Sequence, residues 1–305
     1  MNQQIFIQEV MPRDGLQNED QFVPTSEKIK FINQLGAAGV DKIEATSFVS
    51  PKAIPNLRDA SEVMKGIQKY PNTTYAALVP NLKGAERAVE AGVDEINLLV
   101  SSSNTHNLKN VRRTTDETFD NFSEIIQFLS NYNVSLNGSL GTTFGCPFEG
   151  DVPFEKIYEL VEKYLKLGVN GITLADTTGM ATPKHVKELC SELTKRYPEV
   201  TFTLHFHNTR GMGLANVISG IQTGINRFDA SLGGVGGCPF APGATGNICT
   251  EDLVHMLKFM DYDVNPDLDQ LIQISQQLSD TLKRELPGQV IKSGKITDLH
   301  SSVNA

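Results

Sequence analysis

The residue types best suited to chemistry in this sequence are two histidines, His205 and His207, near the end of the segment 201–207. The segment is rich in β-branched and apolar residues and contains neither glycine nor proline, which predicts a β-strand. Side chains alternate between the two faces of a strand, so the two imidazoles share one face. A pair of imidazoles at this spacing predicts ligands for a divalent metal ion.

The surroundings of this pair place it at the carboxyl end of a strand that leads into a helix. Phe202, Leu204 and Phe206 occupy the opposite, apolar face, and the strand pattern stops at residues 208–211. The residues that follow, 214–218, fit the start of a helix. In α/β folds, active sites are built at this end of the strands.

The composition is ordinary for a globular protein, with 39% hydrophobic and 21% charged residues in a chain of 305. A formal charge of −9 argues against nucleic acid or an anionic membrane as the main partner. No apolar run reaches the length of a membrane span and no signal-peptide pattern opens the chain, so we expect a cytoplasmic protein. The four cysteines, Cys146, Cys190, Cys238 and Cys249, are therefore expected to be thiols.

A short motif that recurs four times indicates the architecture. Its copies are residues 38–44, 91–97, 167–173 and 223–229, and in each a helical pattern stops at a glycine before a short strand. Glycine ends helices because it adopts the left-handed backbone conformation without strain. The repeat therefore indicates a helix-to-strand joint that the chain uses over and over.

Strand candidates alternate with helical patterns along most of the chain. The strands are expected near 5–10, 42–45, 74–79, 95–100, 135–140, 171–175, 201–207 and 227–231, with helices such as 26–38, 117–131, 154–167 and 183–197 between them. Eight such units match an α/β fold, the (β/α)8 TIM barrel, with a doubly wound open sheet as the alternative. We expect a single domain over 1–305, with the barrel at about 4–262 and additional C-terminal helices at about 263–290.

In a barrel, the chemistry belongs at the carboxyl ends of the strands. Strand one runs into Arg13 and Asp14, Glu44 lies on strand two, and Asp176 ends strand six. Strand eight runs into the loop 233–247, which has six glycines in fifteen residues. A loop of this composition approaches a ligand closely and has the freedom to move.

Three motifs of the chain form a recognisable set. They are Arg13-Asp14-Gly15-Leu16-Gln17-Asn18-Glu19, His205-Phe206-His207-Asn208, and Gly236-Gly237-Cys238-Pro239 followed by Gly246-Asn247. Together they resemble the 3-hydroxy-3-methylglutaryl-CoA lyase family, from about Glu9 to Leu257. The first two motifs are shared with other metal-dependent TIM-barrel lyases and Claisen synthases, such as isopropylmalate synthase, whereas the third is typical of the lyase. The synthases also carry a long regulatory extension, and little sequence remains here after Leu286.

The resemblance implies a reaction and a metal. The family cleaves 3-hydroxy-3-methylglutaryl-CoA to acetyl-CoA and acetoacetate, so an alcohol must lose a proton and an enolate must gain one. By resemblance, the metal ligands are Asp14, His205, His207 and Asn247. Two nitrogens together with oxygens suit Mg²⁺ or Mn²⁺, and Co²⁺ would also fit. The base is either Asp14 or a metal-bound water.

The same resemblance implies roles for further residues. Arg13 would polarise the thioester carbonyl and stabilise the enolate. Cys238 would be the general acid, with Glu44 or His205 next in line. Glu44 and Asp176 would line the mouth of the barrel as supporting groups or proton carriers.

A CoA thioester also needs contacts to its phosphates. Lys109 belongs to a basic group in residues 109–113, on an expected mouth-side loop of an otherwise acidic protein. With Arg13, the predicted substrate-binding residues are Gln17, Lys109 and Asn110. We expect an acyl-CoA substrate, no nucleic-acid or membrane partner, and a homodimer.

Most other histidines and cysteines are expected to lie outside the chemistry. We expect surface positions for three histidines and packed, structural positions for three cysteines: His106, His185 and His255, and Cys146, Cys190 and Cys249.

Other functions stay open beside this one. One group uses the same metal site: a lyase for a different 3-hydroxyacyl-CoA, a Claisen-type synthase, or a 2-oxo acid aldolase. Met11 stands where the lyase pattern has glycine, and the stretch around Ser139 lacks the usual aromatic residue, which leaves the acyl group open. A synthase should need its extra domain, and an aldolase has no use for Cys238. A non-catalytic metal-binding protein would not need Arg13 and Cys238 beside four ligands.

Overall fold

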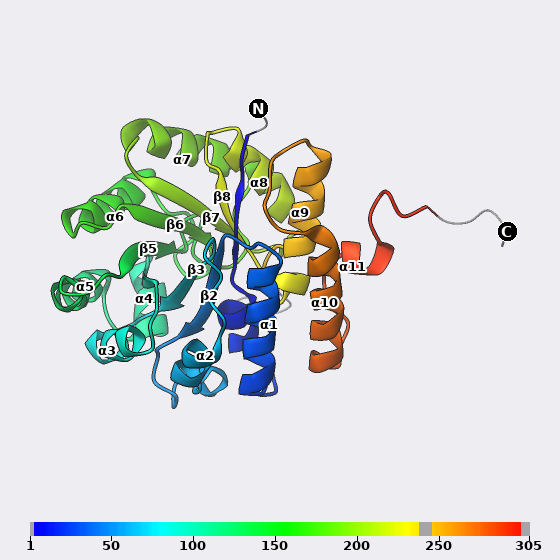
Figure 1. The fold of residues 1–305 in the computed structure, drawn as a ribbon. Helices are drawn as coiled ribbons and strands as arrows, with labels where there is room; N and C mark the ends of the chain where they lie inside the picture. The colour runs from blue at the N-terminus through cyan, green and yellow to red at the C-terminus, as the bar shows by residue number, and fades with distance from the viewer. Residues whose placement is uncertain (1–2, 238–245, 300–305) are drawn as a thin grey trace.

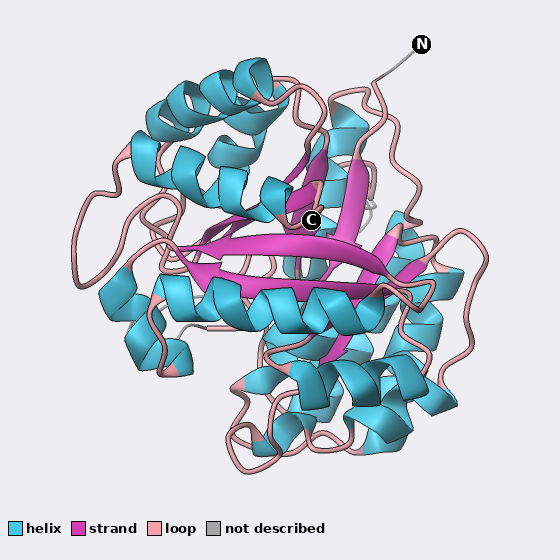
Figure 2. Ribbon diagram, turned by 90° about the vertical axis from the view of Figure 1, so that its left-hand side faces the viewer, coloured by secondary structure: helices cyan, strands magenta, loops and turns pink. Residues whose placement is uncertain are grey.

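Eight parallel strands form a closed barrel at the centre of the protein, and helices surround it (Figure 1 and Figure 2). The computed structural model describes residues 3–237 and 246–299. The strands in these ranges are β1 (Phe6–Glu9), β2 (Lys42–Ser47), β3 (Thr74–Leu78), β4 (Glu95–Ser101), β5 (Ser135–Gly141), β6 (Gly171–Asp176), β7 (Thr201–Phe206) and β8 (Arg227–Ala230). The barrel closes where β1 pairs with β8. The expected strands and the TIM barrel are thus confirmed, and the open sheet is not formed.

The connecting helices lie on the outside of the barrel. They are α1 (Thr25–Ala37), α2 (Ala60–Gly66), α3 (Leu82–Glu90), α4 (Asn104–Val111), α5 (Thr115–Leu129), α6 (Phe154–Lys166), α7 (Pro183–Arg196), α8 (Gly213–Ile221) and α9 (Thr250–Phe259). Three short turns of helix accompany them: η1 (Met11–Gly15), η2 (Pro55–Leu57) and η3 (Leu232–Gly234). The four helices expected from the sequence are found to within two residues of their expected ends.

The recurring glycines turn the chain from helix to strand as expected. Gly39, Gly92, Gly168 and Gly224 all have positive φ angles, between 78° and 91°. Other residues are strained in this conformation, so glycine is the residue that ends each helix here.

Polar side chains fill much of the barrel interior, where branched apolar residues are usual in this fold. Gln8 Nε2 on β1 donates to Thr203 Oγ1 on β7 at 3.2 Å. Lys42 Nζ on β2 pairs with Glu95 Oε1 on β4 at 2.6 Å. Each pair joins strands that are not neighbours in the sheet, so its contact crosses the interior. Buried polar groups need partners, and these pairs form only when the strands have the correct relative positions. The pairs therefore also help to set the positions of the strands in the barrel.

The outer face of the strands forms the apolar core with the helices. Phe202, Leu204 and Phe206 are at most 4% exposed, on the face of β7 opposite to His205, as expected. A Cβ atom on Gly220 of α8 would lie 2.4 Å from Leu204 Cδ1, so the helix backbone rests directly on the strand. This close packing fixes β7, and with it the side chains on its inner face.

Two further helices follow the barrel, as the sequence predicts. They are α10 (Leu268–Leu282) and the short α11 (Val290–Ser293). Figure 1 shows α10 beside α1 and α9, and Gln34 Nε2 of α1 donates to Gln277 Oε1 of α10 at 3.2 Å. Over the ranges that the structure describes, no helix has the length and apolar character needed to cross a membrane.

Candidate active site

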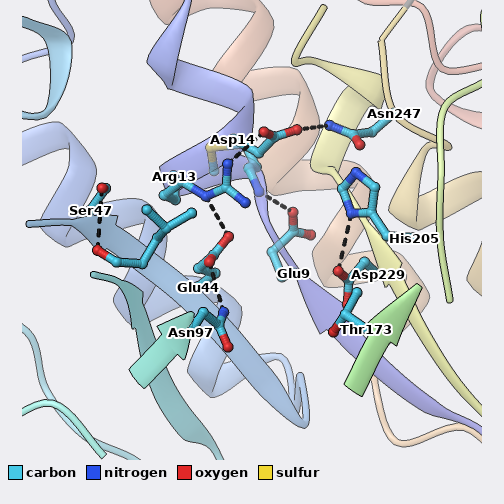
Figure 3. Close-up of polar contacts among 12 residues, drawn as sticks. Glu9, Arg13, Asp14, Glu44, Ser47, Asn97, Thr173, His205, Asp229 and Asn247 are labelled. Atoms are coloured by element: carbon cyan, nitrogen blue, oxygen red, sulfur yellow. Dashed lines mark hydrogen bonds and ion pairs between the residues drawn. The ribbon is translucent and has the colours of Figure 1, made fainter. Parts of the chain in front are cut away.

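Arg13 and Asp14 lie on the tight turn that follows β1. The backbone N–H groups of Arg13, Asp14 and Gly15 all donate to the Val10 carbonyl, at 3.2, 2.7 and 3.2 Å. Pro12 stands at the start of this turn, where a missing N–H has no cost. The turn brings both side chains toward Glu44 on one side and toward His205 and Asn247 on the other (Figure 3).

Two carboxylates hold the guanidinium of Arg13. Its Nε donates to Glu44 Oε2 at 2.5 Å, and its Nη1 donates to Asp14 Oδ1 at 2.7 Å. Asn97 Nδ2 donates to the other oxygen of Glu44 at 2.7 Å (Figure 3). Burial lowers the pKa of Arg13, but the charges of Glu44 and Asp14 outweigh it and raise the pKa above the ordinary value. Arg13 is therefore a fixed positive charge at this end of the barrel.

Asp14, His205 and His207 form a compact group of potential metal ligands. One ligand atom of each residue lies within 4.8 Å of those of the other two. The two imidazoles stand side by side at the end of β7, with ring centroids 5.2 Å apart. The prediction that they share one face of the strand is confirmed.

Asn247 lies against this group. Its backbone forms a bridge with His207, and its Nδ2 donates to Asp14 Oδ2 at 2.7 Å and to the Val235 carbonyl at 3.1 Å. Asn247 Oδ1 and His207 Nδ1 are buried and have no hydrogen-bond partner among the described residues. Buried polar atoms without partners are rare, and a cation between these residues would satisfy them. A carboxylate, two imidazoles and an amide oxygen suit Mg²⁺ or Mn²⁺, so the residues fit the expected metal.

Asp229 orients His205 and was not predicted from the sequence. The Nδ1 atom of His205 is 3.1 Å from Asp229 Oδ2 (Figure 3). A hydrogen bond at Nδ1 leaves Nε2 as the nitrogen that is available to a metal. Strand periodicity puts Asp229 on the inner face of β8, but only the register with β7 reveals its partner.

The charges in this group shift one another's pKa values. Burial raises the pKa of Asp14, but Arg13 and the two histidines outweigh it and lower the pKa to about 2. Burial and the charge of His205 lower the pKa of His207 to about 4. Burial also lowers the pKa of His205, but the hydrogen bond and charge of Asp229 outweigh it and raise the pKa. Asp14 is thus ionised and His207 neutral at pH 7, which are the forms that bind metals.

Asp176 ends β6 and is 1% exposed. Its Oδ1 accepts the backbone N–H groups of Met180 and Ala181, at 2.7 and 3.1 Å, so it stabilises the turn after the strand. Its Oδ2 is buried and has no partner in the described part of the chain. Burial raises the pKa of Asp176 to about 6. One oxygen is therefore structural, and the other stays available for a proton.

The other predicted site residues stand apart from this group. Among the described residues, no hydrogen bond or ion pair joins Gln17, Lys109 or Asn110 to the clustered ligands. Lys109 and Asn110 are exposed on α4, so the loop expected there is a helix. Lys109 Nζ lies 4.9 Å from the ring centroid of Phe148. Cys238 lies outside the described residues.

The expected surface position of His106 is wrong. His106 is 2% exposed, and its Nδ1 is 2.7 Å from Ser101 Oγ. The reason is that α4 begins directly after β4 and its first turn packs onto the end of that strand. His185 and His255 are half-buried, and the His185 ring stacks on Phe154 with centroids 5.4 Å apart.

The packed positions of three cysteines are confirmed. Cys146, Cys190 and Cys249 are buried free thiols. Cys146 Sγ donates to Ser103 Oγ at 3.0 Å, which holds the loop after β5 against the start of α4. Burial raises the pKa of both Cys190 and Cys249, which makes these two thiols unreactive.

A second residue that sequence reasoning missed, Glu9, joins the turns on either side of the site. It is fully buried at the end of β1. Its Oε1 accepts the N–H groups of Met11 in η1 and Leu232 in η3, at 2.8 and 2.9 Å, and its Oε2 accepts Thr250 Oγ1 at 2.7 Å. Burial raises the pKa of Glu9 to about 8. A charged residue within an apolar strand was the only signal that could have revealed it.

Comparisons with known proteins identify the family of the chain. Residues 4–278 match the HMGL-like family. The hydroxymethylglutaryl-CoA lyase YngG of Bacillus subtilis (strain 168) is 44% identical over 292 residues, which cover 95% of this chain and 98% of the relative. The mitochondrial hydroxymethylglutaryl-CoA lyase of Homo sapiens is 40% identical over 287 residues, which cover 94% of this chain and 88% of the relative.

A solved structure is similar over the whole chain. It is an HMG-CoA lyase from Acinetobacter baumannii in complex with coenzyme A and 3-methylmalate, with 54% sequence identity and a TM-score of 0.94. The match covers 98% of this chain and 97% of that one. On this similarity and on the family match, the chain belongs to the HMGL-like family.

Proposed function

We propose that this protein is a divalent-metal-dependent carbon–carbon lyase that cleaves 3-hydroxy-3-methylglutaryl-CoA to acetyl-CoA and acetoacetate. The observation that carries the proposal is the Arg13 guanidinium, which is bonded to Asp14, one of three clustered ligand residues. Cleavage of a β-hydroxy thioester needs a site for the alcohol and a fixed positive charge for the thioester oxygen, side by side. Similarity to lyases that are named for this substrate, at 40% and 44% identity, supports the same reaction here.

Four residues would hold the metal: Asp14, His205, His207 and Asn247. When bound, Mg²⁺ or Mn²⁺ supplies a Lewis acid for the C3 hydroxyl and the carboxylate of the substrate. Asp229 holds the Nδ1 atom of His205 through a hydrogen bond, which leaves the Nε2 atom of the same ring free for the metal.

Arg13 would bind the thioester oxygen and stabilise the negative charge that develops there. Glu44 and Asp14 take up two of its five N–H groups, so the others remain for the substrate. Asn97 fixes Glu44 in turn. A cation that is held in place before the reaction needs no reorganisation while the charge develops.

A proton moves twice in this reaction. The C3 hydroxyl loses a proton as the C2–C3 bond breaks, and C2 of the resulting acetyl-CoA enolate gains one. Asp176 is the proposed acceptor of the proton that the C3 hydroxyl loses. Two observations support it: its Oδ2 is buried without a partner among the described residues, and burial raises its pKa to about 6. Asp14 is the alternative acceptor, and its pKa of about 2 makes it a weak base. Cys238 is the proposed donor, because a thiol is mostly protonated at neutral pH.

The CoA part of the substrate calls for positive charge outside the reacting centre. Lys109 and Asn110 are proposed to contact it, and Gln17 to contact the acyl part. The support for Lys109 and Asn110 is their exposure on α4, which begins directly after the carboxyl end of β4.

Purified protein stripped with a chelator tests the proposal. We expect no turnover without metal, and equal amounts of acetyl-CoA and acetoacetate after Mn²⁺ or Mg²⁺ is added. The sequence departs from the lyase pattern at Met11 and around Ser139, so the identity of the acyl group also needs a test. Other 3-hydroxyacyl-CoA thioesters in the same assay show which acyl group the protein cleaves. Full turnover in a demonstrably metal-free sample would contradict the metal dependence, and no turnover with either metal would contradict the reaction.

We also infer how the chain is organised. A homodimer is supported by the exposed apolar side chains of Phe259, Met260, Ile296 and Leu299, and light scattering tests it. A cytoplasmic location is supported by the free thiols in the described part of the chain, and cell fractionation tests it. A single domain is supported by Leu271 of α10, which belongs to the same apolar core as the barrel.

A further inference from the structure

The loop after β7 carries an arginine, Arg210, that the proposed chemistry does not use. A tight turn fixes the backbone of this loop. The N–H group of Gly211 donates to the carbonyl of Asn208 at 2.9 Å, and the N–H group of Gly213 donates to Asn208 Oδ1 at 3.0 Å. Arg210 is exposed, but the backbone from which its side chain projects is held in place.

Arg210 binds the turn that follows β6, residues 177–181. Its Nη1 donates to two consecutive backbone carbonyls, those of Thr178 at 3.0 Å and Gly179 at 2.7 Å. Hydrogen bonds from a charged donor are stronger than those between neutral groups. A Cβ atom on Gly179 would lie 2.6 Å from Thr209 Cβ, so the two loops are in direct contact beside these bonds. Arg210 thus joins the β6 turn to the β7 loop.

The same turn holds the carboxyl group of Asp176, the proposed proton acceptor. Asp176 Oδ1 accepts the N–H groups of Met180 and Ala181, which directly follow Gly179. The orientation of the carboxyl group therefore depends on the conformation of the turn. Oδ2 belongs to the same rigid group, so the turn also sets the direction of the oxygen that would take the proton.

Thr142 holds the β6 turn from the side of β5. Its N–H group donates to Thr177 Oγ1 at 2.8 Å. Thr142 is fully buried and has a φ angle of 56°, a strained conformation for any residue other than glycine. Such strain persists only where the surroundings hold it, and here Ser102 Oγ donates to the Thr142 carbonyl at 2.8 Å. The turn is therefore fixed on this side, and Arg210 holds it on the side of β7.

The pairing of β6 with β7 places this arrangement beside the metal ligands. In the parallel register, Asp176 pairs with Phe206, the residue between His205 and His207. Arg210 follows His207 by three residues. The two bonds of Arg210 therefore connect the segment that carries the acceptor to the segment that carries two ligands.

We propose that Arg210 is a positioning residue for the proton acceptor: through the β6 turn, it sets the direction of Asp176 Oδ2 relative to the two histidine ligands. The inference rests on the proposed function, in which Asp176 accepts the proton of the C3 hydroxyl. A misplacement of about 1 Å costs about 10²-fold in rate, so loss of the two bonds lowers kcat. Both bonds go to the β6 turn, so the affinity for the metal should not change.

The test measures kcat, KM and Mn²⁺ affinity in Arg210→Met and Arg210→Gln. Both changes remove the charged donor, and the exposure of Arg210 predicts that both variants keep the parental melting temperature. We expect kcat to fall by about 10-fold or more, with KM and Mn²⁺ affinity close to parental. Assays at about pH 8 keep Asp176 ionised, because its pKa is about 6, so the lost rate reports its position and not its charge.

Lys69→Met is the matched control. Lys69 Nζ also donates to a backbone carbonyl, that of Gly92 at 2.6 Å, and it is likewise a cation at the surface. Gly92 precedes β4, so this bond lies at the amino ends of the strands, opposite to the mouth. The control should keep the parental kcat.

A double variant distinguishes positioning from general stabilisation. In an Asp176→Asn background, Arg210→Met should cost little more, because residues that act through one group are not additive. Asparagine keeps an oxygen for the N–H groups of Met180 and Ala181, so the turn itself should survive.

Parental kcat in both Arg210→Met and Arg210→Gln would overturn the inference. So would an undiminished effect of Arg210→Met in an impaired Asp176→Asn background, or a loss of Mn²⁺ affinity that matches the loss of rate. Parental turnover in Asp176→Asn would refute Asp176 as the acceptor, and the inference with it. Absence of turnover in the parent protein would refute the proposed function itself.

Discussion

His205 Nδ1 lies 3.1 Å from the carboxylate of Asp229, and this contact decides which nitrogen of the imidazole is free for a metal. The two residues are partners in the parallel register of β7 and β8, and both are at most 8% exposed. A carboxylate at Nδ1 fixes the tautomer and makes the other nitrogen a stronger ligand. The orientation of His205 is therefore built into the sheet.

Replacing Asp229 with asparagine should weaken Mn²⁺ binding by about 10- to 100-fold. Asparagine keeps the size of the side chain but removes the charge that makes the imidazole a better ligand. Titration calorimetry on metal-stripped protein measures the affinity without reference to turnover. Thr203→Val, which changes another polar side chain of the barrel interior, is the control. Parental Mn²⁺ affinity in Asp229→Asn would show that this carboxylate does not tune the site.

Arg13→Met should reduce kcat by about 10²–10³, which is the usual cost of losing one donor to a developing oxyanion. The variant should still fold, because Arg13 lies at the mouth of the barrel and outside the apolar core. Arg13→Lys should not rescue the rate, since an ammonium cannot contact Glu44, Asp14 and the substrate with one planar fork. Steady-state kinetics beside circular dichroism measure both properties, and a kcat close to parental would remove Arg13 from the mechanism.

Local patterns were enough to predict the barrel and the pair of histidines at its mouth. The period of two along β7 puts His205 and His207 together, and a glycine with positive φ, such as Gly39, ends a helix wherever the repeat occurs. The barrel also predicts that Asp14 lies at the same mouth, because every parallel strand delivers its carboxyl end there. The role of Asp14 as a ligand, like that of Asn247, was implied by the resemblance to the lyase family. None of these steps requires knowledge of which strand residues face each other.

Pairs between distant segments could not be predicted in this way. The partners Asp229 for His205 and Asn97 for Glu44 depend on strand register and on contacts across the interior. His106 was expected at the surface, and only the packing of α4 onto the end of β4 buries it. These positions are set by tertiary packing, which overrides the local preference of the residue.

The buried carboxyl group of Glu9 predicts how stability depends on pH. Burial raises its pKa from 4.5 to about 8, so the unfolded chain releases this proton at a lower pH than the folded one. The stabilising contribution is full below pH 4.5 and is lost as the pH rises to about 8. Glu9→Gln should make the fall in unfolding free energy between pH 5 and pH 8 shallower, by at most about 1.4 kcal/mol per pH unit.

Urea unfolding of parent and Glu9→Gln at several pH values between these limits measures this effect. Glutamine keeps an oxygen for the N–H groups of Met11 and Leu232 and offers an N–H to Thr250, so the local bonds survive. Part of the slope should remain, because burial also raises the pKa of the neighbouring Glu251. Equal slopes in parent and variant would mean that Glu9 is already ionised in the folded protein.

Cys238→Ser should lower turnover by about 10²–10⁴, the range for general acid–base groups, while Mn²⁺ binding and melting temperature stay parental. A thiol has a reference pKa of about 8.5 and gives up its proton far more readily than a serine hydroxyl of nearly the same size. The other three cysteines serve as internal controls for alkylation, because buried thiols react slowly. Cys146, Cys190 and Cys249 are at most 7% exposed. Iodoacetamide should therefore alkylate Cys238 first, and bound product should protect it. If Cys238 only packs the loop, the substitution will lower the melting temperature and leave the rate of the folded enzyme intact, and the proton must then come from Glu44 or His205.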